Sequence, residues 1–348
     1  MKKQKIRFYA ALLCSSMVFS LVSTPVSAAE TGQLTNPPTS TEGPGSPESA
    51  SGNEAAAMLN GLYAALPVAN GVKEVATAEE LTAALENNAN DTVKLTADIT
   101  INTTLTISRT VTLDLNGNVL KMTGSGSVIK VESGGSLTIA DSNTTTQHNF
   151  TPNGDGLWVL DETGGSKFVY GGTGMPPGVN YSEGGGVYVS AGAALTMNGG
   201  SIVGCKAESG GGVCIVYDYT AQKTSEFIMK GGSIIGCTAS SGGGVLIRSG
   251  CRFTMNSGSE IRCCTARTGG GVTINASSSL AGSFTLAGGK IHKCKAYVAN
   301  NFLSHGGGIS NEGEFIMESG CIENCTSQSQ RDDNKSSGVY NKGKLFIL

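Results

Sequence analysis

The stretch GGSIIGCTASSGGGVLIRSGCRFTMNSGSEIRCCTARTGGGVTI, residues 231–274, decides the fold class of this chain. It contains two Gly-Gly-Gly triplets, which begin at Gly242 and Gly269, and each triplet is followed by a short apolar strand. A Phe-x-Met pair and an Ile-x-x-Cys-x-Ala segment lie between the triplets. The same parts recur on both sides, so this stretch contains one full unit of an internal repeat, from one triplet to the next, together with parts of its neighbours.

The repeat covers residues 184–348. Its triplets begin at Gly184, Gly210, Gly242, Gly269 and Gly306, with a degenerate Ser336-Ser-Gly338. The apolar pairs are Leu195/Met197, Phe227/Met229, Phe253/Met255, Phe284/Leu286 and Phe315/Met317. The cysteines at equivalent places are Cys205, Cys237, Cys264, Cys294 and Cys325. Variable distances between triplets indicate that loops absorb the differences in length.

This pattern predicts an all-β fold, a right-handed parallel β-helix solenoid. Successive coils of such a fold stack at about 4.8 Å, so each inward position lies on its own copy in the next coil. We expect ladders of Val/Ile, Phe, Met, Ile, Cys and Ala inside. The glycine triplets would supply corners with positive φ where the chain turns between sheets.

The β-helix is expected over residues 72–348. Thr77-Ala-Glu-Glu80 is a capping box that starts a short helix, and this helix would cover the open apolar end of the first coil. Period-two strands separated by Asn, Thr and Gly turns follow it. Residues 143–183, rich in Gly and Pro, interrupt the periodicity and are expected to form a long loop insertion.

The N-terminus has the features of a secretory signal peptide over residues 1–28: a basic start, the apolar stretch Phe8–Leu21, and Val26-Ser27-Ala28 as the cleavage site. Residues 29–71 have the composition of a disordered linker, within which residues 54–66 are compatible with a short helix. We therefore expect a secreted, extracellular or cell-surface protein with no membrane span in the mature chain. Only 15% of the residues are charged and the net charge is -3, which argues against nucleic acid as a partner.

Nine cysteines remain after the predicted signal peptide, and this odd number argues against a simple disulfide framework. The five repeat cysteines are expected to be a structural ladder of small buried side chains. A soft-metal site or disulfides along the ladder are alternatives, but in-register side chains point in parallel, and His148, His292 and His305 show no ligand spacing. We expect no metal and no cofactor.

Ile-x-x-Cys-x-Ala followed by Gly-Gly-Gly-Val resembles the repeat pair of the chlamydial polymorphic outer-membrane proteins, Phe-x-x-Asn-x-Ala and Gly-Gly-Ala-Ile/Leu/Val. The chain has Cys where that family has Asn, and Ile where it has Phe. The stretch VKEVATAEELTAALENNANDTVKLTADITI, residues 72–101, resembles the opening coils of pectate-lyase-like bacterial surface proteins. These resemblances imply a surface adhesin, of which the chain would hold the passenger-like solenoid.

A polysaccharide lyase or glycoside hydrolase on a β-helix needs clustered carboxylates on one exterior face. The acidic residues of the repeats do not recur at one repeat position, so we expect no enzyme. The runner-up is a polysaccharide-degrading site on the early coils and the 143–183 loop. There Asp155 and Asp161 flank Trp158, a combination suited to stacking against a sugar, and these three residues are the candidate ligand-binding site. The alternative is an ordinary loop in which Trp158 is a buried anchor.

The function expected from the sequence is therefore that of an adhesin-like binding or structural module that contacts glycans or surface proteins. The last residues, Gly343–Leu348, match the start of another repeat without a capping segment. An uncapped coil exposes strand edges, so end-to-end association is a further expectation.

Overall fold

The computed structural model describes residues 71–143, 145–146, 148–152, 158–165, 168–170, 183–297, 304–328 and 337–348. All of them fall in the unit that spans Ala65–Leu348. The predicted signal peptide and all but the last residue of the predicted linker, with its short helix, lie outside the described residues.

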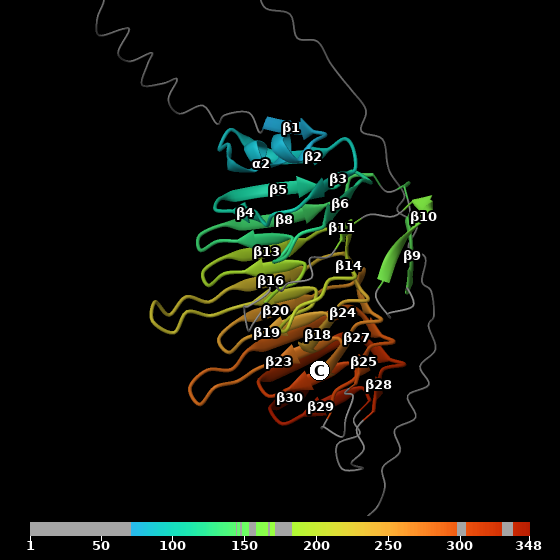
Figure 1. Cartoon of the computed structure of the whole chain (residues 1–348). Coiled ribbons are helices and arrows are strands. Elements are labelled where there is room, and N and C mark those ends of the chain that lie inside the picture. Colours follow the sequence, from blue (N-terminus) through green and yellow to red (C-terminus); the bar gives the residue numbers. More distant parts are fainter. Residues whose placement is uncertain are drawn as a thin grey trace, which may run out of the picture. The chain divides into compact units, whose positions relative to one another are not determined.

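The described chain winds as a parallel β-solenoid whose strands pair with their equivalents in the preceding and following coils (Figure 1). This confirms the predicted all-β parallel solenoid. Apart from one antiparallel pair described below, the strands form four faces, which we number in the order in which the chain first reaches them. A 16-stranded sheet contains faces 1 and 2, because the long strands β24 and β27 run through both.

Face 1 consists of β1 (Gly71–Val75), β2 (Asn90–Leu95), β5 (Thr110–Asp114), β8 (Ser136–Ala140), β13 (Ala194–Met197), β16 (Glu226–Met229), β20 (Arg252–Met255), the first halves of β24 (Ser283–His292) and β27 (Glu314–Glu323), and β30 (Lys344–Ile347). Face 2 consists of β3 (Ile99–Ile101), β6 (Val119–Met122), β11 (Phe168–Tyr170), β14 (Ser201–Val203), β17 (Gly232–Ile235), β21 (Ser259–Arg262) and the second halves of β24 and β27.

Face 3 is the eight-stranded sheet of β4 (Leu105–Ile107), β7 (Ile129–Val131), β12 (Val187–Val189), β15 (Val213–Ile215), β19 (Val245–Ile247), β23 (Val272–Ile274), β26 (Ile309–Asn311) and β29 (Val339–Asn341). Face 4 is a short sheet between faces 2 and 3 in the later coils, formed by β18 (Thr238–Ser241), β22 (Thr265–Thr268), β25 (Lys295–Ala296) and β28 (Thr326–Ser327).

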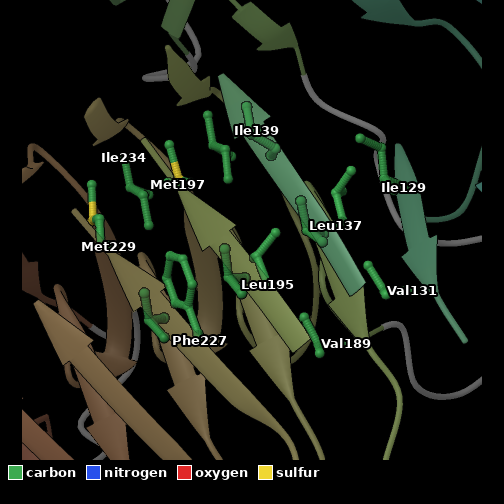
Figure 2. Packing of buried hydrophobic residues seen from close by; sticks show 14 of the residues in the cluster. Ile129, Val131, Leu137, Ile139, Val189, Leu195, Met197, Phe227, Met229 and Ile234 are labelled. Atoms are coloured by element: carbon green, nitrogen blue, oxygen red, sulfur yellow. The ribbon is translucent and has the colours of Figure 1, made fainter. Parts of the chain in front are cut away.

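The interior is filled by ladders of identical or similar side chains, as predicted. Phe227, Phe253, Phe284 and Phe315 stack with ring centroids 4.6, 4.7 and 5.3 Å apart. The same register continues through Leu195 and Leu137 in earlier coils. Figure 2 shows how these side chains meet others from faces 2 and 3, such as Ile234 and Val189, in one apolar core.

The glycine triplets are required at all three positions, as the triplet at Gly242 shows. Gly242 has φ +64°, as expected for a corner. A Cβ at Gly243 would lie 2.6 Å from the carbonyl oxygen of Thr265. A Cβ at Gly244 would lie 2.8 Å from Ile261 Cγ2. The first glycine therefore permits the turn, and the other two permit the close approach of neighbouring coils.

Helix α2 (Ala78–Glu86) packs beside the first coils, where its buried residues Leu81, Ala84 and Leu85 join the core. Its predicted capping box is present: the Thr77 hydroxyl accepts from the Glu80 N–H, and the Glu80 carboxylate accepts from the Thr77 N–H. At the other end, the Arg109 guanidinium donates to the carbonyl oxygens of Leu85 (2.8 Å) and Ala84 (3.1 Å). Both ends of the helix are thus fixed by side chains of the chain itself.

The segment 143–183, expected to be a long loop, contains strands. Strands β9 (His148–Pro152) and β10 (Trp158–Gly165) form an antiparallel pair, and β11 joins face 2 between β6 and β14. Phe150 of β9 packs against Val119, Val203 and Ile235 on the outer side of face 2. The three residues Phe168-Val-Tyr170 are too short a run to show a period in the sequence, which is why this rung of the solenoid was missed.

Candidate functional site

The corner between faces 3 and 1 is built from stacked turns. The short turns 132–135, 190–193 and 248–251 each contain a glycine with positive φ, at Gly134, Gly192 and Gly250. Their N–H groups donate along the solenoid axis: Gly134 to the Gly192 carbonyl (3.0 Å), Gly192 to that of Thr224 (3.0 Å) and Gly250 to that of Ala281 (3.1 Å). The turn backbone therefore forms a continuous, internally bonded corner.

A longer loop, residues 216–225, replaces the short turn between β15 and β16. Backbone bonds between Asp218 and Lys223 close it, and the Asp218 carboxylate accepts from the N–H groups of Thr220 and Ala221. These two bonds lower the pKa of Asp218. The loop carries Tyr219, which is 58% exposed and meets Tyr217 edge to face at 5.1 Å.

A groove of about 340 Å³ runs along this corner across neighbouring coils. We call it the corner groove. It is lined by Gly134, Gly135, Ser136, Gly192, Ala193, Ala194, Thr224, Ser225, Glu226 and Arg252. Lys223 borders it, since its side chain passes Gly192 and its Nζ lies 3.3 Å from Ser133 Oγ two coils earlier. Small residues make the floor, and the end of the loop makes one wall.

Two charged side chains of the corner groove are available to a ligand. Glu226 and Arg252 are register neighbours in β16 and β20, and both are exposed. Among the residues that the structure describes, neither side chain makes a hydrogen bond or an ion pair. By contrast, Thr224 Oγ1 donates to the Gly250 carbonyl (2.5 Å) and Ser225 Oγ to the Val216 carbonyl (2.6 Å). Glu226 and Arg252 are therefore the two charged lining side chains whose polar groups stay unpaired within the described residues.

A second group of charged residues lies on the outer side of face 2, in β21, β24 and β27. Glu260 accepts from Arg262 Nε (3.0 Å) and lies 2.6 Å from His292 Nε2. Lys290 pairs with Glu323 at 2.5 Å. This hydrogen bond lowers the pKa of Glu323 and raises the pKa of Lys290. These contacts join side chains of neighbouring strands and so tie β21, β24 and β27 together on face 2.

The structure leaves the sequence-predicted ligand site untested. Trp158 and Asp161 belong to β10, whose side chains are not among those described, and Asp155 lies outside the described residues. Those three residues therefore stay a prediction. Within the described parts of the chain, no group of three or more His, Cys, Asp or Glu is placed to hold a metal ion.

The repeat cysteines occupy buried positions in successive coils. Each Sγ from Cys237 onward lies 3.7–3.9 Å from the carbonyl oxygen of an isoleucine in the preceding coil. Burial raises the pKa of the Cys237, Cys264 and Cys294 thiols well above the ordinary value. Such thiols are protonated near neutral pH, which fits a packing role.

Two cysteines outside the ladder are also buried in the structure. Cys214 lies on the outer side of face 3 between Tyr188 and Leu246, and burial raises its pKa. Cys251 lies at the start of β20, 3.4 Å from Ser225 Oγ.

Comparison with known proteins gives one finding about this fold. Residues 72–168 match the family model of a putative pectate lyase-like adhesive domain. The matched residues run from β1 through α2 to the start of β11. No curated protein and no solved structure matches the chain. The match supports the resemblance of the opening coils to pectate-lyase-like surface proteins, and the resemblance to the chlamydial repeats stays a prediction.

The spacing of the triplets contains one signal of the corner groove. The distance between the triplets at Gly210 and Gly242 is longer than its neighbours, and the extra residues are those of loop 216–225. Which coils this loop adjoins depends on how the coils stack, and so could not be derived from the spacing.

Over the described residues, no helix is long and apolar enough to cross a membrane.

Proposed function

We propose that this protein is a secreted or cell-surface adhesive β-solenoid that contacts a glycan or a surface protein through the corner groove. The observation that carries the proposal is the groove itself, with the unpaired Glu226 and Arg252 beside an exposed loop. The match of residues 72–168 to an adhesive domain supports the same function. The predicted signal peptide supports the location.

The shape of the site favours contact with an extended partner. The groove follows the solenoid axis over strands β8, β13, β16 and β20, which lie about 4.8 Å apart in succession. At Gly134, where a Cβ would meet no atom within 4 Å, a flat or narrow ligand can approach the backbone closely, whereas the Lys223 side chain lies over Gly192. A surface of this kind gives modest affinity per site, which repeated presentation on a surface would raise.

The test is binding of the full chain to an array of glycans and to intact cells. We expect binding that falls about tenfold or more when loop 216–225 is shortened to the Ser-Ala-Gly-Ala sequence of turn 190–193. The matched control shortens loop 275–282, which lies at the same corner between β23 and β24 but does not line the groove. That control should bind like the unmodified chain.

Two results would contradict the proposal. One is a full chain that binds neither glycans nor cells. The other is equal binding by both loop variants, which would place the contact elsewhere. Release of unsaturated or reducing ends from polysaccharides in the same samples would instead support the enzymatic alternative.

A further inference from the structure

We propose that the corner groove binds oligosaccharides that carry a carboxylate, and that Arg252 is the residue that binds this carboxylate. The inference rests on the proposed function, because it names the ligand class of the same groove. It is argued from the floor of the groove, from its unpaired side chains and from the charges around it.

The floor of the groove suits a sugar better than a peptide. The N–H groups of Gly134 and Gly192 are bonded along the axis, so this part of the floor offers no free backbone donors to a peptide strand. Gly134 is open to solvent, since a Cβ built there would have no atom within 4 Å. A pyranose ring has an apolar C–H face and hydroxyls at its edge, which match a floor of Gly and Ala with polar groups beside it.

The unpaired guanidinium of Arg252 determines the chemical class of the sugar. A guanidinium binds a carboxylate through two parallel hydrogen bonds, which are stronger than bonds to neutral hydroxyls. Glu226 is the register neighbour of Arg252 in the adjacent strand, and the two side chains form no ion pair in the structure. The guanidinium of Arg252 therefore remains free to bind the carboxylate of a ligand.

The charges around Arg252 allow a test in which acidic and neutral ligands predict opposite changes in affinity. Lys223 adds a positive charge beside Gly192, while Glu226 is the one acidic residue that lines the groove. If the ligand is acidic, Glu226 repels it, and Glu226→Gln should strengthen binding. If the ligand is neutral, its hydroxyls donate to Glu226, and the same substitution should weaken binding.

The experiment measures binding of the full chain by calorimetry at low ionic strength. One probe is a hexasaccharide of alternating glucuronic acid and N-acetylglucosamine, with its carboxyl-reduced form as the neutral match. The second pair is sialyllactose and lactose, which distinguishes a sialic acid from a uronic acid as the source of the carboxylate. We expect at least one acidic probe to bind about tenfold or more tightly than its neutral match.

The variants locate the contact. We expect Arg252→Ala to lower affinity for the acidic probe about tenfold or more, and Arg252→Lys to lower it less, because one ammonium replaces the two-pronged contact. Glu226→Gln should raise affinity about twofold to fivefold at low salt, and added salt should reduce this gain. Arg267→Ala, an exposed arginine of β22 on face 4, is the matched control and should leave affinity unchanged.

Equal affinity for acidic and neutral probes, or no loss with Arg252→Ala, would overturn the inference. So would weaker binding of the acidic probe by Glu226→Gln. If the full chain binds cells or neutral glycans and ignores both acidic probes, the carboxylate assignment fails while the adhesive function stands. If it binds none of these partners, both proposals fail.

Discussion

Phe253 lies between the rings of Phe227 and Phe284 and is 1% exposed. Its replacement by Ala removes the stacking contacts with both neighbouring rings. It also leaves a cavity that the neighbouring coils cannot fill, because their own ladders hold them in place. We expect Phe253→Ala to lower the free energy of unfolding by about 3–5 kcal/mol, measured by chemical denaturation.

The control for Phe253 is its neighbour Thr254, which lies on the outer side of the same strand. Thr254→Ala should change the free energy of unfolding by no more than about 0.5 kcal/mol. A cost below about 1 kcal/mol for Phe253→Ala would mean that the ring stack contributes little, since losses from a packed core are normally larger.

Cys263 and Cys264 are adjacent in sequence and differ in environment. Cys263 is half-buried at a corner with φ +56°, whereas Cys264 is fully buried and has a raised pKa. Since the thiolate is the reactive form, we expect iodoacetamide at pH 8 to alkylate Cys263 in the folded protein and to leave Cys264 unmodified. Peptide mass spectrometry distinguishes the two sites.

Denaturant provides the control for the thiol experiment. About 6 M guanidinium unfolds all but the most stable domains. Under these conditions, both cysteines should react at similar rates. Equal rates in the folded protein would show that the ladder opens to solvent on the timescale of the reaction.

At the scale of elements, the capping box is the feature that can be removed with the least other change. Thr77→Ala deletes the hydroxyl that accepts from the Glu80 N–H. We expect it to destabilise helix α2 by about 1 kcal/mol. Faster hydrogen exchange should appear in α2, β1 and β2. Exchange in β19 and β23 should not change, because a coil of a solenoid contacts only its neighbours.

A second element-scale prediction concerns the segment just before β26 and its contact with β29 in the last coils. His305 stacks on Tyr340 with ring centroids 4.0 Å apart, and its Nδ1 lies 3.2 Å from Ser310 Oγ. Burial lowers its pKa, and Lys342 lowers it further. The folded state therefore prefers neutral His305, so its contribution is complete above the unfolded pKa of about 6.5 and is lost as the pH falls through the lower folded value.

The measurement is the melting temperature between pH 8 and pH 5 for the unmodified chain and for His305→Gln. The unmodified chain should lose more stability than the variant once the pH falls below about 6.5. Parallel curves would show that protonation of His305 does not affect folding.

The sequence predicted the elements whose residue pattern repeats often enough to be recognised. The Ile and Cys positions recur five times, and the Phe and Met positions recur five times with one Leu each, so their register could be derived from spacing alone. Face 4 and β11 were missed as strands because runs of two to four residues are too short to show a period. The corner groove was missed for another reason: Glu226 and Arg252 become neighbours only when coils with loops of different length are stacked in register.

At the scale of the whole solenoid unit, stability is distributed. Each coil is held by ladders to the coil before and the coil after, and the apolar core runs without a break from Val75 to Cys325. A local defect should therefore weaken nearby coils first, and the site at the corner depends on β8, β13, β16 and β20 keeping their register.

The direction of the backbone hydrogen bonds gives this architecture a mechanical consequence. The bonds point from one coil to the next, along the axis. Tension applied to the two ends of the unit would therefore load the bonds of one coil at a time and peel coils off in sequence. Each step would release roughly 90 Å of chain for a coil of about 27 residues, at ~3.3 Å per residue. Under load, the unit would lengthen gradually and dissipate work, while the coils still wound would keep their fold.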